Sequence, residues 1–399
     1  MILISLGLLI VALLVILLGG LLLVEVLAAS LLGPAALEPI GLQPRVVKRL
    51  TVIIPAHNEE SVLPHTLASL RPQLSSQIQA VVIADNCTDA TASVARLAGV
   101  SVLERDDPQR RGKGYALDFA LQALSTNPPD VVIVVDADCL VLPGAIAQLG
   151  GQALNSGQPV QAVYLMEQPS ETSLKNQVSA FAFKVKNQVR PLGLTYLGWP
   201  CPLTGTGMAF PWAVIATVDL ASGHIVEDMK LGLDLAIAGY PPQLCPTAQV
   251  RGQLPTADTA HDSQRTRWEH GHLQVLQQYV PRLLGEALKQ QQWKLVIMAL
   301  DLAIPPLSLL VLLWLGVLAI AVAWGYFSAI WVPAGLLITA GLLLLVAILI
   351  AWDRFGRESL SLQQLLRFPF YVLWKIPLYA QFLLKPQSQW IRTRRDSSN

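Results

Sequence analysis

The sequence has few charged residues for its length. Asp, Glu, Lys and Arg make up 14% of its 399 residues, whereas a soluble domain carries about 25%. The formal net charge is only +1, which gives none of the basic surface that nucleic-acid binding requires. The mean hydropathy is +0.49. The composition therefore indicates a membrane protein and predicts no nucleic-acid partner.

Cysteine pairs and nucleotide-loop motifs are missing as well. The four cysteines lie far apart and form no CxxC pair, which predicts neither a disulfide framework nor a zinc site. No GxGxxG follows the first predicted strand and no GxxxxGK(S/T) occurs, which disfavours a dinucleotide enzyme and a P-loop ATPase. We expect reduced thiols in a cytosolic domain at Cys87, Cys139, Cys201 and Cys245.

Residues 1–32 are almost entirely apolar, with Glu25 as the single charged side chain. A helix needs roughly 20 apolar residues to cross the hydrocarbon core. The run lacks the basic start and the short apolar stretch of a cleavable signal peptide, so we expect a retained transmembrane helix. Arg45, Lys48 and Arg49 follow it. Because basic residues favour the cytoplasmic flank, the N-terminus is predicted to face outward.

Two further spans are predicted within residues 300–352, at about 302–327 and 330–352. The break between them is rich in aromatic residues, which suits the outer interface. Arg354 and Arg357 close the second span, and these arginines belong on the cytoplasmic side.

The segment 362–385 has two interpretations. It is apolar and aromatic but carries Arg367 and Lys375, and a fourth span here would place the basic tail at 386–399 outside the cell. An amphipathic helix in the interface, with a cytosolic tail, is therefore favoured over a fourth span. Together these segments predict an integral protein of a bacterial inner (cell) membrane with a cytoplasmic catalytic domain.

Between these ends, residues 48–292 alternate short β-rich runs with helical ones. Continuous apolar strands separated by helices indicate an α/β domain with a mostly parallel, Rossmann-like sheet that is covered on both faces. The predicted strands are residues 50–54, 80–84, 100–104 and 131–135.

Polar residues follow three of these strands. His57 comes after the first, where Asn58 is predicted to cap a helix that runs to Leu70. Asp85 and Asp136 follow the second and the fourth. Because ligands bind beyond the carboxyl ends of parallel strands, these residues predict one shared site.

Asp136 and Asp138 form a DxD pattern at the end of a strand that contains four valines. Two carboxylates beside a diphosphate can hold Mg²⁺ or Mn²⁺, which take oxygen ligands and bridge phosphates. Such a metal neutralises charge on a leaving group. The pattern is also common by chance, and its position after the strand is what favours a metal site.

Three other polar segments each have a functional and a purely structural interpretation. Lys113 lies between glycines, which let the backbone approach an anion, but RRGKG also suits a solvated basic loop. Glu227 and Asp228 precede a helical pattern, either as general base for an acceptor hydroxyl or as acids favoured at a helix start. Residues 264–268 (QRTRW) begin a helix that either holds a sugar and phosphate or lies in the interface.

Seven short segments occur in a fixed order over residues 50–268: LTVIIPAHN, ADNCTDAT, RRGKGYALDFAL, VVDAD, TGTG, VED and QRTRW. This set resembles the membrane-bound inverting glycosyltransferases of family 2, the group that contains cellulose, hyaluronan and chitin synthases and ceramide glucosyltransferase. The resemblance implies a GT-A fold, a nucleotide-sugar donor that is expected to be a UDP-sugar, and Mg²⁺ or Mn²⁺ as cofactor.

The resemblance also implies the roles of individual residues. Asp228 matches the catalytic base, and Asp138 the metal ligand, with Asp136 in support. His57 stands in place of an aromatic residue that stacks on uracil, and Ala84 stands where the family often has an acid. The implied donor-binding residues are Pro55, His57, Glu59, Asp85, Lys113, Asp136 and Asp138. The implied acceptor-binding residues are Glu227, Gln264, Arg267 and Trp268.

Two acceptor classes remain open. One is a lipid or lipid-linked acceptor that receives one or few sugars, and the other is a growing polysaccharide threaded through the membrane. Polymer-secreting relatives build a channel from more spans than three, which favours the lipid acceptor. The alternative of a different class is a non-catalytic membrane subunit with a degenerate transferase domain, and the presence of Asp138, Asp228 and Arg267 argues against it. Neither the sugar nor the oligomeric state follows from the sequence.

Overall fold

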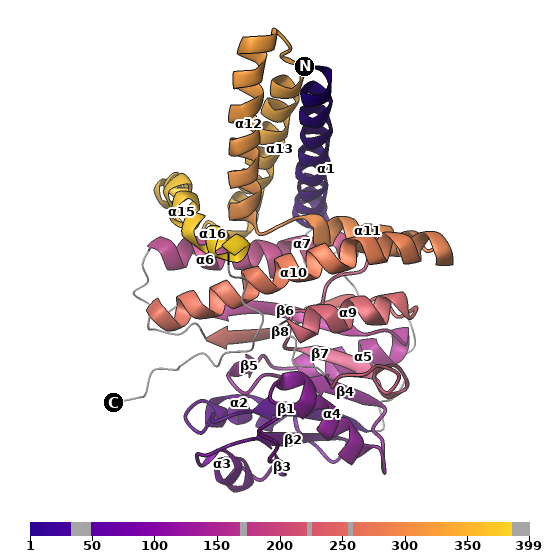
Figure 1. Ribbon diagram of the computed structural model, residues 1–399. Helices are drawn as coiled ribbons and strands as arrows, with labels where there is room; N and C mark the ends of the chain where they lie inside the picture. Colours follow the sequence, from indigo (N-terminus) through magenta and orange to yellow (C-terminus); the bar gives the residue numbers. More distant parts are fainter. Residues whose placement is uncertain (33–48, 168–173, 222–225, 254–257, 385–399) are drawn as a thin grey trace.

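The computed structural model describes residues 1–32, 49–167, 174–221, 226–253 and 258–384. Figure 1 shows a bundle of long helices at one end and an α/β domain at the other, with a layer of helices between them. The helices of this middle layer are α6 (Leu174–Lys184), α7 (Arg190–Tyr196), α10 (Asp258–Gln290) and α11 (Trp293–Ala303).

One eight-stranded sheet organises the described part of the α/β domain, in the order β3-β2-β1-β4-β7-β6-β8-β5. β1 pairs in parallel with β2 and β4, and β2 pairs in parallel with β3. These are the four predicted strands, each within two residues of its expected bounds. β7 pairs antiparallel with β4 and β6, so the sheet is mixed beyond β4. The strands are β1 (Leu50–Ala56), β2 (Ile78–Asp85), β3 (Ser101–Arg105), β4 (Val131–Val134), β5 (Cys139–Val141), β6 (Val160–Glu167), β7 (Met208–Pro211) and β8 (Gln243–Gln253).

Helices cover both faces of the parallel part, as the continuous apolar strands predict. Leu50 and Val52 of β1 belong to a buried cluster that includes side chains of α2 and α5. Ile53 of the same strand belongs to a second cluster, with side chains of α4 and α9. The helices of this domain are α2 (Leu63–Leu70), α3 (Thr91–Leu97), α4 (Lys113–Leu124), α5 (Ala145–Ser156), α8 (Trp212–Ile215) and α9 (Glu227–Ile237), with a 3₁₀ turn, η2, at Arg71–Gln73.

Asn58 does not cap the helix after β1, so that prediction is wrong. The helix α2 begins at Leu63, with Val62 in the capping position. Asn58 has a φ of 55°, and its side-chain oxygen accepts a hydrogen bond of 2.7 Å from the backbone N–H of Thr88. The loop after β1 is therefore tied to the loop after β2, which delays the helix by one turn.

Three helices are long and apolar enough to cross a membrane within the described ranges: α1 (Ile2–Leu32), α12 (Leu307–Ser328) and α13 (Val332–Phe355). They match the three predicted spans. α1 also packs on α7 of the middle layer, where a Cβ on Gly193 would lie 2.0 Å from the backbone oxygen of Glu25. Only glycine permits that approach, because the obstructing atom belongs to a helix backbone.

The segment predicted as an interface helix or a fourth span folds as three short helices. These are α14 (Leu362–Leu365), α15 (Phe368–Trp374) and α16 (Ile376–Leu384). None has the roughly 20 residues that a span needs. α15 packs against α12 and α6 beside the middle layer (Figure 1). The basic tail at 386–399 lies outside the described residues, as do Arg45 and Lys48.

Candidate active site

A cavity of about 570 Å³ lies between the strand ends and the middle layer of helices. It collects nearly all the residues that the sequence nominates, from segments more than 200 residues apart. Those that line it are Pro55, His57, Glu59, Asp85, Lys113, Asp136, Asp138, Glu227, Asp228, Arg267 and Trp268. Gln264 lies on α10, but its side chain is outside the described part of the chain.

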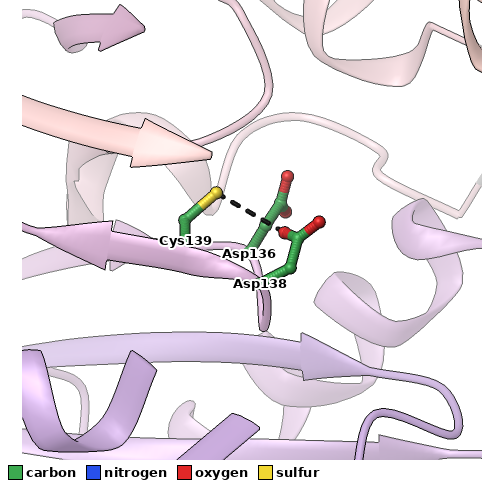
Figure 2. Close-up of side chains that lie close together, drawn as sticks. All are labelled: Asp136, Asp138 and Cys139. Atoms are coloured by element: carbon green, nitrogen blue, oxygen red, sulfur yellow. Dashed lines mark hydrogen bonds between the residues drawn. The ribbon is translucent and has the colours of Figure 1, made fainter. Parts of the chain in front are cut away.

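The DxD carboxylates lie in the turn between β4 and β5. Figure 2 shows Asp136 and Asp138 side by side, with the Cys139 sulfur 3.5 Å from Asp138 Oδ1. One ligand atom from each residue lies within 4.8 Å of the others. Burial raises the pKa of the Cys139 thiol well above its usual range, so the thiol stays neutral. The two carboxylates supply the oxygen ligands that Mg²⁺ or Mn²⁺ takes, and the donor set therefore fits a hard cation.

Lys113 neutralises one of these carboxylates. It begins α4, and its ammonium donates hydrogen bonds to Asp136 and, at 2.6 Å, to the carbonyl oxygen of Gly205. Burial lowers the pKa of Lys113, but the nearby carboxylates of Asp136 and Glu227 outweigh burial and raise it above its usual range. Lys113 is therefore a permanent cation between the DxD turn and the TGTG loop.

Glu227 and Asp228 begin α9. A Cβ on Gly205, whose φ is +94°, would lie 3.1 Å from Asp228 Oδ2. Burial and the negative charge of Asp228 raise the pKa of Glu227 to about 7. Asp234, on the same helix, does not line the cavity and instead forms a 2.7 Å ion pair with Lys230. Asp228 and Glu227 thus line the cavity, whereas Asp234 does not.

The outer parallel strands β2 and β3 end in an ion pair that no sequence motif predicts. Arg105, the last residue of β3, donates a 2.6 Å hydrogen bond to Asp85 Oδ1. His57 Nδ1 lies 2.7 Å from the backbone oxygen of Asp85. Burial raises the pKa of Asp85, and Arg105 partly offsets that effect. The predicted strand ended one residue before Arg105, and no motif marks this arginine.

The QRTRW helix provides one wall of the cavity. The Trp268 ring lies 5.6 Å from the Phe183 ring, which in turn packs edge-on against Tyr164. Arg267 lines the cavity and forms no ion pair with any residue in the described ranges. The Trp268 ring can stack on a sugar. The Arg267 guanidinium, which has no ion-pair partner in the described residues, can bind a phosphate.

The cavity also extends to the membrane-facing end of the domain, where four further residues were not predicted. Lys186, Arg190, His272 and Asp301 line this part, and they come from different elements without a shared motif. Arg190 forms buried ion pairs with Asp301, at 2.5 Å, and with Glu25 of α1, at 2.7 Å. The apolar residues that complete this end are Leu22, Ile304, Pro305, Pro306, Leu307, Phe368 and Tyr371.

Residues 47–271 match a family model described as "Glycosyltransferase like family 2", which is more than half of the chain. The chain belongs to this family. The DxD turn, the acidic pair on α9 and the QRTRW segment all lie within the matched residues. The match confirms the resemblance inferred from the motifs and the α/β fold expected with it.

Curated relatives carry the name 4,4'-diaponeurosporenoate glycosyltransferase. The protein from Staphylococcus haemolyticus (strain JCSC1435) is 28% identical over 201 residues, which are 46% of this chain and 50% of that protein. The protein from Staphylococcus aureus (strain USA300) is 38% identical over 98 residues, 24% of this chain and 25% of that protein. The chain thus spans about half the length, or less, of these curated relatives.

Among solved structures, glucosyl-3-phosphoglycerate synthase from Mycobacterium tuberculosis in complex with Mn²⁺, UDP-glucose and phosphoglyceric acid is 22% identical. The similarity covers 49% of this chain and 69% of that chain, with a TM-score of 0.35. The family is shown by the match of residues 47–271 to the family model.

Proposed function

We propose that this protein is a membrane-bound inverting glycosyltransferase that moves a sugar from a nucleoside-diphosphate-sugar, expected to be a UDP-sugar, to a lipid or lipid-linked acceptor. The observation that carries the proposal is the single cavity. It joins the DxD carboxylates at one end to Asp228 and then to apolar residues of α1, α12 and α15 at the other.

The proposed reaction is a single displacement at the anomeric carbon. The acceptor oxygen forms the new glycosidic bond, its proton passes to Asp228, and the bond from the sugar to the diphosphate breaks with its electron pair leaving on the nucleoside diphosphate. Asp138, supported by Asp136, is the proposed ligand set for Mg²⁺ or Mn²⁺, and the bound metal neutralises charge on the diphosphate.

The remaining residues of the cavity are assigned by their positions. His57 and Asp85, with Pro55 and Glu59 nearby, are proposed to hold the nucleoside at the ends of β1 and β2. Lys113 and Arg267 are proposed to bind phosphate oxygens, since both are cations at the cavity surface. Trp268 is proposed to stack on the transferred sugar or on the acceptor, with Glu227 and Gln264 near the acceptor.

A lipid acceptor is favoured over a polysaccharide because the cavity continues into apolar residues at the base of the helix bundle. The relatives named above act, by their name, on 4,4'-diaponeurosporenoate, and an apolar acceptor of that general kind suits this end of the cavity. A channel for a polymer is built from a larger bundle of transmembrane helices than the three candidate spans of the described residues.

The proposed location is a bacterial inner membrane with the transferase domain in the cytoplasm. Arg354 lies in the last turn of α13 and Arg357 just after it, at the end of the helix nearer to this domain, in agreement with the preference of basic residues for the cytoplasm. An impermeant thiol reagent applied to intact cells should therefore not label a cysteine introduced at Ser397. Strong labelling there would contradict the orientation.

The experiment that tests the activity is incubation of the purified protein with a panel of UDP- and GDP-sugars and detection of released nucleotide. We expect release from at least one donor, at a rate that rises when a membrane-lipid extract is added. No release from any donor, with and without the extract, would contradict a transferase.

A further inference from the structure

A partly buried lysine lies at the membrane-facing end of the cavity, away from the DxD turn. Lys186 belongs to η3 (Val185–Val189), a π-helical turn between α6 and α7, and it lines the cavity. π-helical turns are rare and occur frequently at functional sites. Within the described ranges of the chain, the Lys186 ammonium takes part in no hydrogen bond or ion pair.

The carboxylates near Lys186 already have other partners, except for Asp228. Asp301 is paired with Arg190, and Glu269 of α10 is paired with Lys375. Burial lowers the pKa of Lys186, and the Asp228 carboxylate is the nearby charge that opposes this effect most strongly. In the described residues, therefore, Lys186 lines the cavity with no carboxylate paired to it.

The next residue adds an unused hydrogen-bond acceptor. Asn187 is 4% exposed and lines the same cavity. Its side-chain oxygen is buried and accepts no hydrogen bond from any residue in the described part of the chain. Buried polar groups are nearly always satisfied, so an orphaned acceptor at a cavity wall indicates a ligand that donates to it.

We propose that Lys186 and Asn187 form the head-group subsite of the acceptor, in which Lys186 binds an anionic oxygen beside the hydroxyl that is glycosylated. This inference rests on the proposed function and adds the substrate class, an amphipathic hydroxy compound that carries a carboxylate or a phosphate. Asn187 accepts a hydrogen bond from the same head group. The apolar chain of the acceptor lies along Leu22, Ile304 and Leu307.

The subsite belongs to the acceptor because the donor diphosphate has its own cations. Lys113 contacts Asp136 directly, and Arg267 lies beside the sugar-stacking Trp268. The largest charge effects on the pKa of Lys186 come from Asp228, Arg190, Glu269 and Asp301. Because η3 joins α6 and α7 of the middle layer, Lys186 lines the cavity from that layer, as expected for a residue that meets the acceptor.

The test measures the binding of two matched pairs of probes to the full chain in neutral detergent with UDP and Mn²⁺ present. The carboxylate pair is 2-hydroxyhexadecanoate and its methyl ester. The phosphate pair is a lysophosphatidic acid and the monoacylglycerol with the same chain. Hydrogen bonds to charged groups are worth enough for at least a tenfold difference in affinity. We expect the protein to prefer the anionic member of one pair by about tenfold or more, and the pair that responds identifies the anion.

Three variants show whether Lys186 is responsible for the preference. Lys186→Met should lose it by weakening the anionic probe and sparing the neutral one, and Lys186→Arg should retain it. Lys184→Met is the matched control, since Lys184 is two residues away and does not line the cavity. Equal binding of both members in both pairs, or a preference that survives Lys186→Met, would overturn the subsite.

UDP titration separates this inference from the proposed function. A protein that binds UDP with Mn²⁺ but shows no preference for an anionic probe contradicts the head-group subsite alone. A protein that binds no nucleoside diphosphate contradicts the proposed transferase function itself.

Discussion

Arg190 of α7 and Glu25 of α1 form a buried ion pair, with Arg190 Nε 2.7 Å from Glu25 Oε2. The guanidinium also binds Asp301 of α11, so one arginine holds two carboxylates. Glu25 is the single charge in an otherwise apolar helix, and it is fully buried. The triad therefore fixes the first membrane helix to the wall of the cavity.

The first prediction concerns the asymmetry of this triad. Arg190→Met leaves Glu25 and Asp301 buried without a cation, and removal of one partner of a buried pair costs about 3–5 kcal/mol. Glu25→Gln leaves Arg190 paired with Asp301 and should cost less. Thermal melting of both variants in detergent measures the difference, with Lys184→Met as the control. If Glu25→Gln melts at a lower temperature than Arg190→Met, loss of the cation is not the costlier change, and this prediction is wrong.

The second prediction uses two glycines with the same backbone angle. Gly205 and Gly239 both have φ +94°, but a Cβ on Gly205 meets Asp228 at 3.1 Å whereas one on Gly239 meets nothing within 4 Å. Both alanine variants bear similar backbone strain, of the order of 1–3 kcal/mol. Only Gly205→Ala should also displace Asp228 and lower the transfer rate, by about tenfold to a hundredfold.

UDP affinity and transfer rate, measured for both variants, check this prediction. Gly239→Ala is expected to transfer sugar at nearly the normal rate. Equal losses of transfer in the two variants would mean that strain alone, and not contact with Asp228, explains the effect.

The third prediction concerns acid stability. Burial and the positive charges of Lys186 and Arg190 lower the pKa of His272 to about 3, whereas a free histidine titrates near 6.5. The unfolded chain therefore binds more protons between these values, and the stability that neutral His272 provides is lost as pH falls from 6.5 towards 3. At pH 5 the loss is about 2 kcal/mol.

His272→Gln should reduce the fall in melting temperature between pH 7.5 and pH 5. The exposed His65 provides the control variant, His65→Gln, which should follow the unaltered protein. If His272→Gln and the unaltered protein lose the same stability over this interval, His272 is not the responsible group.

The fourth prediction concerns the DxD turn. UDP should bind more tightly with Mn²⁺ than with EDTA, because the metal masks the diphosphate from Asp136 and Asp138. Asp138→Ala should remove most of that difference, and the exposed Asp106→Ala should keep it. Titration calorimetry with and without metal measures both. Transfer at the full rate in EDTA would rule out the metal role.

The parallel half of the fold follows from local patterns. The strands β1, β2, β3 and β4 are continuous apolar runs, and the site residues after them meet because parallel strands end at one edge. The same reasoning explains why His57, Asp85 and Asp136 line one cavity.

Other features depend on contacts between residues that are far apart in the sequence, and a local pattern does not reveal such contacts. Asn58 has the right residue type for a helix cap, but its partner is Thr88 on a different loop. Arg105 and Lys186 acquire their positions from strand pairing and from a π-helical turn, neither of which has a sequence signature here. The strands β6, β7 and β8 likewise were not predicted, since β6 pairs in parallel with β8 across more than 70 residues of chain.

The central claim is that Asp228 is the general base, and the comparison of Asp228→Asn with Glu227→Gln tests it most directly. Both residues line the cavity at the start of α9, and each substitution keeps the shape of the side chain. General bases contribute about 10²–10⁴-fold to rate. Transfer by Asp228→Asn should therefore fall at least a hundredfold while UDP affinity changes little, and Glu227→Gln should retain most of its transfer. Near-normal transfer by Asp228→Asn, with an inactive Glu227→Gln, would assign the base to Glu227 and contradict the account.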